Sequence, residues 1–397
     1  MLNRADHSEE LARLLRDHMG VRDKDAWLVS LYAREDASPE WATLFSTIDV
    51  DREPFAFNYL LARAGAKFGW KNVPDDLAPR LQGVRRKFVA KNAVLLADAL
   101  KFLRAMNEGG VMPLVVRGGA LRLALLPDIP QKMYDVDAVV LRSEYERSCA
   151  LAVERGFEHD YYVAHSADFR IGGRACVDLH YTVFKANIQG EEPTDAIFAH
   201  GTRVERGGAI FLVPCPEDAF LILMVNIVAN YLSRELPKGP VTWLADCYDL
   251  AQRYELSYAG IVAHAREYGV LAEFKVALAL MRSYLPNAFP GLYAAAEDCE
   301  IDAALLRRVE RCVRELAQAG RPDTGISAFE HLRRVATYTY AKYRGFYCLD
   351  GSPLQAAGGY CSYLWRTICA SEGIKHVWEL PRAVHHHIQT WSKREQE

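Results

Sequence analysis

Apolar and polar positions divide the chain into three stretches with different periods. Over residues 9–110, apolar side chains recur at helical spacing, beginning with Leu11 and Leu14. Over residues 111–214 the period shortens toward two, which is typical of strands. Helical spacing returns over residues 216–391. The pattern therefore predicts two helical regions on either side of a strand-rich segment.

Strand-like runs in the middle segment are interrupted by two helical stretches. The runs cover residues 111–116, 134–140, 157–163, 174–183 and 209–213. The helical stretches cover 120–126 and 144–155. This order predicts a small α/β unit with a mixed sheet. We therefore expect an α+β protein with a helical region at 1–110, an α/β domain at 111–214 and a helical bundle at 215–397.

Composition narrows the choice of protein class. The 397 residues are 50% hydrophobic, which is enough to bury a large core. Forty-eight basic and 51 acidic residues give a formal charge of −3, so no basic excess indicates nucleic acid or an anionic membrane. The start lacks an apolar signal core, and the longest apolar run, 219–228, is too short to span a bilayer. Nine scattered cysteines without a Cys-x-x-Cys pair indicate reduced thiols, so we expect a cytoplasmic protein with no membrane partner.

Three aspartates lie on strand-like runs of the middle segment. Asp135 and Asp137 are two positions apart, so they share one face of a strand while apolar residues take the other. Asp178 repeats this pattern on a second run. A solvated strand face is the alternative, but carboxylates on two apolar strands more often pair or bind metal. Three hard oxygen ligands suit Mg²⁺ with its waters and nucleotide phosphates, which predicts a nucleotidyl-transfer site.

Gly118 and Gly119 follow the first apolar run of the middle segment. Glycine lets backbone N–H groups approach a phosphate closely, and the helix expected next adds partial positive charge at its N-terminus. An ordinary tight turn is the alternative for such a pair.

Three blocks of the sequence resemble one known family. Residues 115–123, 133–140 and 177–181 are similar to the signature blocks of the uncharacterised nucleotidyltransferase family, within the polymerase-beta-like superfamily. Weaker similarity extends over about 80–385. The resemblance implies a polymerase-beta-like catalytic domain between the helical regions. It also implies a metal-dependent enzyme that uses a nucleoside triphosphate.

The resemblance implies roles for the acidic and glycine residues. Asp135 and Asp137 would bind Mg²⁺ ions that bridge the phosphates, and Asp178 would hold the second ion near the attacking hydroxyl. Gly118 and Gly119 would bind the phosphates.

Two basic residues mark departures from the family pattern. Arg117 stands where relatives commonly have lysine, and its guanidinium could still contact a phosphate. Lys132 could supply a charge that the altered motif lacks ahead of Asp135, or could be solvated.

The acceptor is less well defined than the reaction. We expect a small-molecule hydroxyl or phosphate in a biosynthetic pathway, because the chain has no basic excess. Transfer to tRNA or to a protein side chain, as in toxin-type relatives, is the first alternative. A nucleotide-binding protein without turnover and a purely structural helical scaffold are the others.

Three further positions have both functional and ordinary interpretations. His180 shares a face with Asp178, so it could orient an acceptor, tune the carboxylate or be a hydrogen-bonded structural histidine. Asp246 could lie over the nucleotide or be solvated. Residues 385–387 are three consecutive histidines, which point in different directions on a helix and indicate a surface cluster.

Overall fold

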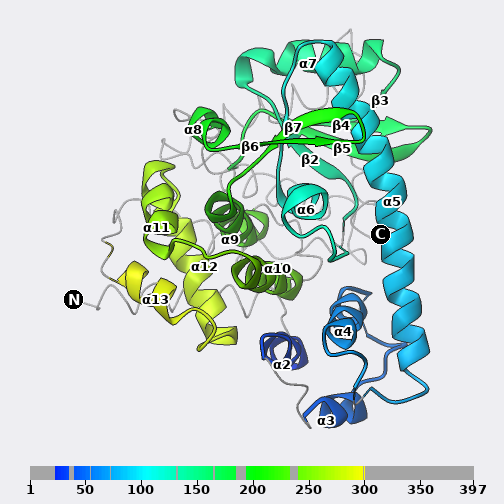
Figure 1. Ribbon diagram of the computed structural model, residues 1–397, viewed down its shortest axis with the longest axis vertical. Coiled ribbons are helices and arrows are strands. Elements are labelled where there is room, and N and C mark those ends of the chain that lie inside the picture. The colour runs from blue at the N-terminus through cyan, green and yellow to red at the C-terminus, as the bar shows by residue number, and fades with distance from the viewer. Residues whose placement is uncertain are drawn as a thin grey trace, which may run out of the picture.

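In the described part of the chain, seven strands form one mixed sheet with helices around it (Figure 1). The computed structural model describes residues 23–34, 40–53, 55–71, 73–130, 133–163, 166–184, 194–232, 240–297 and 299. The strands are β1 (Leu114–Val115), β2 (Val136–Val139), β3 (Glu158–Val163), β4 (Ser166–Ile171), β5 (Arg174–His180), β6 (Thr202–Arg206) and β7 (Ala209–Val213). Their order is β3-β4-β5-β2-β1-β7-β6. The pairs β2–β5 and β1–β7 are parallel and the others are antiparallel, which confirms the predicted α+β class with a mixed sheet.

Helices precede, interrupt and follow the strands, as the periodicity predicts. The first group is α2 (Asp23–Tyr32), α3 (Glu40–Thr47), α4 (Phe55–Lys67) and α5 (Ala78–Glu108). Among the strands lie α6 (Arg117–Ala120), the π-helical turn η1 (Leu121–Leu125), the 3₁₀ turn η2 (Arg142–Glu144), α7 (Tyr145–Glu154) and α8 (Thr194–Ala199). The last group is α9 (Pro216–Leu232), α10 (Pro240–Arg253), α11 (Tyr258–Glu267), α12 (Leu271–Tyr284) and α13 (Pro290–Glu297). The histidines at 385–387 lie outside the described residues.

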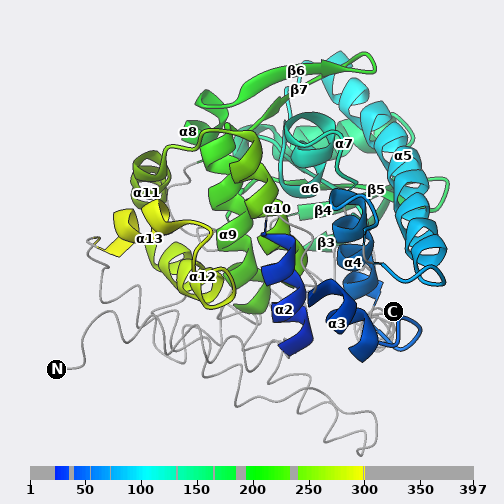
Figure 2. The same cartoon turned by 60° about the horizontal axis from the view of Figure 1, so that its bottom comes forward.

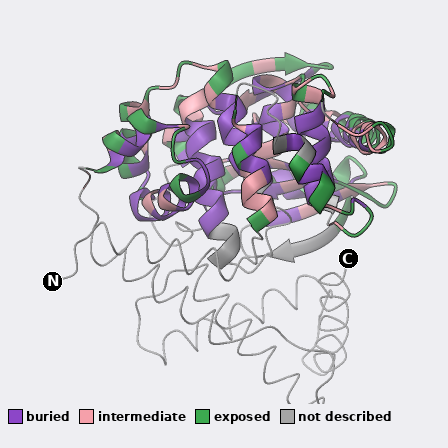
Figure 3. Ribbon diagram, turned by 90° about the horizontal axis from the view of Figure 1, so that it is seen from below, coloured by how far each residue is buried: buried purple, intermediate pink, exposed green. Residues whose placement is uncertain are grey.

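The core is built between α5, the sheet and the helices around α9. Helix α5 packs along β7 and β5, and Figure 3 shows exposed residues around much of its outer surface. Helix α9 contacts α10, α11 and α12, which surround it in Figure 2. Residues 218–228 of α9 are all buried, as expected of a stretch that is apolar except for Asp218 and Asn226. The described helices include none with the length and apolarity that a membrane crossing requires.

A buried ion-pair network joins α2 and α4 to α10. The Arg63 guanidinium of α4 pairs with Asp246 and Asp249 of α10. The Tyr32 hydroxyl of α2 donates a hydrogen bond to Asp249. Asp246 is only 6% exposed, so the interpretation of it as a solvated aspartate is wrong. It is buried because Arg63 compensates its charge.

Candidate functional site

The register of two parallel strands brings two of the predicted aspartates together. Strands β2 and β5 pair so that Asp137 lies directly opposite Asp178. Directly paired residues point to the same face of a sheet, because side chains alternate along each strand. The two carboxylates therefore lie side by side, although they come from separate parts of the sequence.

His180 completes this acidic cluster. Its Nε2 lies 2.9 Å from Oδ2 of Asp178 and 3.3 Å from Oδ1 of Asp137. The imidazole is 3% exposed, whereas the two carboxylates are 16% and 19% exposed. One possible ligand atom from each of these three residues lies within 4.8 Å of the others. The sequence placed His180 beside Asp178, but its contact with Asp137 depends on the β2–β5 pairing.

Arg117 contributes a second positive charge to the cluster. Its guanidinium forms an ion pair with Asp137. The chain turns sharply at this residue, because Arg117 adopts a left-handed φ of 54°. The preceding residue, Val116, donates its backbone N–H to the Asp137 carbonyl. This backbone conformation is unfavourable for a residue with a side chain, and such strain is most often retained at functional sites. Its ion pair with Asp137 is compatible with the predicted phosphate contact.

The charges of the cluster shift one another's protonation. Burial, together with Asp137 and Asp178, raises the pKa of Asp135 to about 7. Burial acts in the same direction on Asp137, but Arg117 and His180 outweigh it and lower the pKa of that carboxyl. Burial disfavours the charged imidazole, yet Asp178 and Asp137 raise the pKa of His180 to about 9. At neutral pH a protonated His180 therefore lies between two carboxylates.

The donor set fits a divalent cation. Asp137 and Asp178 offer oxygen ligands of the kind that Mg²⁺ prefers, and Asp135 stands immediately before β2, close enough for its charge to interact with both. The imidazolium of His180 supplies positive charge between the same two carboxylates. A metal ion at this position would take over that charge and favour release of protons from the cluster.

Gly118 and Gly119 lie in the first turn of α6, where the chain leaves β1. A Cβ on Gly119 would lie 2.8 Å from methyl groups of Val115 and Val136, so a side chain there has no room. The first backbone hydrogen bond of the helix is donated by the Ala120 N–H to the Val116 carbonyl. The N–H groups of Gly118 and Gly119 come before it in the chain and are not used within the helix. Close packing explains Gly119, and the phosphate role of both glycines stays a prediction. Lys132 lies outside the described residues.

Comparison with known proteins identifies the family. The sequence profile described as "Uncharacterised nucleotidyltransferase" matches residues 56–286, more than half of the chain. The protein therefore belongs to this nucleotidyltransferase family, as its motifs predict, and a nucleotide is the substrate that membership implies.

Comparisons with solved structures and with curated proteins say less about the family than the sequence profile does. The solution structure of the antibiotic-resistance factor ANT(2'')-Ia is similar at 16% identity and a TM-score of 0.30, over 45% of this chain and 92% of that chain. No curated protein matches at a significant level.

Proposed function

We propose that this protein is a cytoplasmic, Mg²⁺-dependent nucleotidyltransferase with its catalytic domain at residues 111–214. It would move a nucleoside monophosphate from a nucleoside triphosphate to an acceptor and release pyrophosphate. The observation that carries the proposal is the register of β2 and β5, which sets Asp137 directly beside Asp178. Family membership supports the reaction class.

The residues of the cluster divide the work of the reaction. Asp135, Asp137 and Asp178 would hold Mg²⁺, which neutralises the phosphates and lowers the pKa of the attacking hydroxyl. His180 fixes the orientation of the Asp137 and Asp178 carboxylates, since it contacts both. Phosphoryl transfer depends mostly on such positioning and charge neutralisation.

The phosphates would lie against the start of α6. The N–H groups of Gly118 and Gly119 make no backbone hydrogen bond among the described residues, and Arg117 adds a guanidinium at the same turn. The acceptor oxygen attacks the α-phosphorus, and the bond from that phosphorus to the pyrophosphate oxygen breaks. Asp178, on the strand next to Asp137, would take the hydroxyl proton. Lys132 is a further candidate for the phosphates.

A small molecule is the acceptor that we propose. The formal charge of −3 supports this choice, because enzymes that bind tRNA need positive surface to neutralise phosphates. Transfer to tRNA or protein, and nucleotide binding without turnover, are outcomes that the following experiment separates.

The first test is a thermal shift with each nucleoside triphosphate and Mg²⁺. We expect at least one nucleotide to raise the melting temperature of the wild type, because ligands that bind only the folded state stabilise it. The variants Asp137→Asn and Asp178→Asn should lose this shift. Asp76→Asn changes an exposed aspartate before α5 and should keep it, which makes it the matched control.

Pyrophosphate release then separates an enzyme from a binding protein. Wild-type protein is incubated with the stabilising nucleotide and, in turn, small metabolites, tRNA and proteins. Release with the metabolite pool alone supports the proposal, whereas release with tRNA or protein assigns another acceptor. A thermal shift without release in any pool would indicate nucleotide binding without turnover, and the absence of any shift would contradict the proposal.

A further inference from the structure

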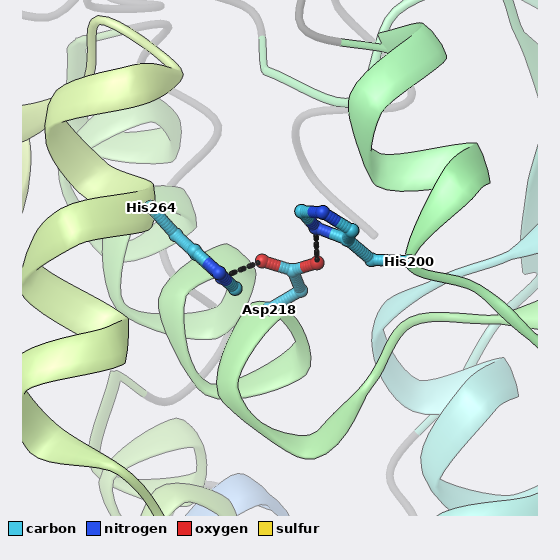
Figure 4. Close-up of side chains that lie close together, drawn as sticks. All are labelled: His200, Asp218 and His264. Atoms are coloured by element: carbon cyan, nitrogen blue, oxygen red, sulfur yellow. Dashed lines mark hydrogen bonds and ion pairs between the residues drawn. The ribbon is translucent and has the colours of Figure 1, made fainter.

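A second cluster of metal-ligand residues lies outside the candidate catalytic site (Figure 4). Asp218, in the first turn of α9, stands between His200, which follows α8, and His264 in the last turn of α11. Nδ1 of His264 lies 2.8 Å from Oδ1 of Asp218, and Nδ1 of His200 lies 3.6 Å from Oδ2. Ligand atoms from all three residues lie within 4.8 Å of one another.

The charge on Asp218 is the feature that needs compensation. Its side chain is fully buried, whereas those of His200 and His264 are 39% and 23% exposed. Within the described part of the chain, the basic side chains within 4.0 Å of its carboxylate are these two histidines, which form ion pairs with it only when protonated. The imidazole rings are nearly parallel, with centroids 5.0 Å apart, so two positive charges there would repel each other. Buried charges are usually paired or bound to metal, and a divalent ion would compensate Asp218 without that repulsion.

Distances and donor types fit a transition metal. Zn²⁺ binds histidine nitrogen and carboxylate oxygen at about 2.0–2.2 Å in tetrahedral geometry, which places neighbouring ligands roughly 3.4 Å apart. The 3.6 Å between Nδ1 of His200 and Oδ2 of Asp218 is close to that value, whereas the 2.8 Å between Nδ1 of His264 and Oδ1 is a hydrogen-bond distance that an ion would widen. Mixed imidazole and carboxylate donors suit Zn²⁺ better than Mg²⁺. The partly exposed histidines leave a route for the ion and for a water as fourth ligand.

Tyr268, directly after α11, contacts the carboxylate that we consider as a ligand. Its hydroxyl donates to Oδ2 of Asp218 at 3.2 Å and lies 3.0 Å from Nδ1 of His200. Burial and the Asp218 charge raise the pKa of this phenol, so it stays a donor and fixes the carboxylate. Such outer contacts orient the ligands of protein metal sites.

We propose that His200, Asp218 and His264 form a binding site for one divalent transition metal ion of the zinc type. The ion would join α8, which precedes the edge strand β6, to α9 and α11 of the helical region. Its role would be structural, holding the last part of the sheet segment against the helices. The site shares no residue with the Asp137–Asp178–His180 cluster.

Zinc content of the intact protein tests this site directly. Metal-free protein is equilibrated with Zn²⁺, and bound metal is measured after removal of excess. We expect His200→Ala to bind one Zn²⁺ per chain fewer than the wild type and to lose the accompanying rise in melting temperature. His159→Ala replaces an exposed histidine on β3 and should keep both. Because residues 385–387 and the nine cysteines also offer ligand types for metal, the result is read as the difference between variants.

Two further variants make the result decisive. His264→Gln keeps the bulk of the side chain and should lose the same Zn²⁺ ion, together with the visible absorption of Co²⁺ substituted for it. The variant Asp137→Asn should retain this Zn²⁺ ion, whether or not the variant still binds nucleotide. A failure of the zinc proposal can therefore be distinguished from a failure of the proposed reaction. Equal zinc content in the wild type, His200→Ala and His264→Gln would overturn the site.

Discussion

At the scale of single residues, burial and the neighbouring carboxylates make the charged form of Asp135 unfavourable. Its pKa is raised from 3.8 to about 7. A carboxyl whose pKa is higher in the folded than in the unfolded state makes a contribution to stability that is fully present at pH values below the unfolded-state pKa. That contribution is lost as the pH rises through the folded-state pKa. We therefore expect the melting temperature of the wild type to fall relative to Asp135→Asn between about pH 4 and about pH 8.

Magnesium provides the control for this pH effect. A cation favours the ionised carboxylate, so Mg²⁺ should reduce the difference at the alkaline end of the range in the wild type. Melting curves of the two proteins that change in parallel with pH, with and without Mg²⁺, would show that Asp135 does not titrate in this range.

Gly119 gives a second prediction for a single residue. Its replacement by alanine places a Cβ against Val115 and Val136 in the packed layer between α6 and the sheet. We expect Gly119→Ala to lower the free energy of unfolding by about 1–3 kcal/mol, measured by urea denaturation. Gly83→Ala is the matched control, because nothing lies within 4 Å of a Cβ there and helix α5 should gain about 0.5–1 kcal/mol. Equal effects of the two substitutions would contradict the packing argument.

The residue types and their spacing by two along each strand were enough to predict part of the candidate cluster. Alternation placed Asp135 and Asp137 on one face, and the same rule applied to Asp178 identified the strand that would face them. The contacts of His180 and Arg117 with Asp137 could not be predicted in this way. They depend on which strands pair and on the sharp turn after β1, and neither leaves a local pattern.

At the scale of elements, the strands that the sequence missed lack the expected apolar alternation or show it weakly. Strand β6 lies at the sheet edge, and its residues are exposed except for the partly buried Val204. Strand β4 does alternate, with Ala167 and Phe169 buried, but half of its six residues are polar. A strand with a larger share of apolar residues is easier to recognise, as β7 shows, in which all five residues are apolar.

The network around Arg63 leads to a prediction about how helices are joined. Replacing Arg63 by methionine would leave Asp246 and Asp249 buried without their guanidinium partner. Loss of one partner from a buried ion pair typically costs about 3–5 kcal/mol, so Arg63→Met should lower the free energy of unfolding by that amount. Urea denaturation monitored by circular dichroism measures the change.

The control for Arg63 is an arginine whose ion pair is exposed. Arg52 pairs with Asp49 three residues away, and its side chain is 88% exposed. Arg52→Met should change the free energy of unfolding by less than about 0.5 kcal/mol. A similar loss for both arginines would mean that burial of the Arg63 network adds nothing to stability.

At the scale of the whole molecule, one hydrophobic cluster extends from α2 to α13. The family profile begins at residue 56, yet Leu28 and Leu31 of α2 are buried in the same cluster, and Tyr32 bonds to Asp249 of α10. The order of helices, sheet and helices followed from periodicity. The packing of the first described helices on the later ones could not be predicted in this way, because contacts between distant segments produce no periodic pattern in the sequence.

The parallel pairing of β2 with β5 also limits how this chain can change in length. Successive side chains of β5 point to opposite faces, so inserting or deleting one residue inside the strand would turn Asp178 toward the apolar side. The turn at Gly172 and Gly173, where both residues have positive φ, lies outside the strand and can absorb such a change. Among relatives of this protein, length variation should therefore accumulate at that hairpin tip. Within β5, only insertions or deletions of an even number of residues should be tolerated.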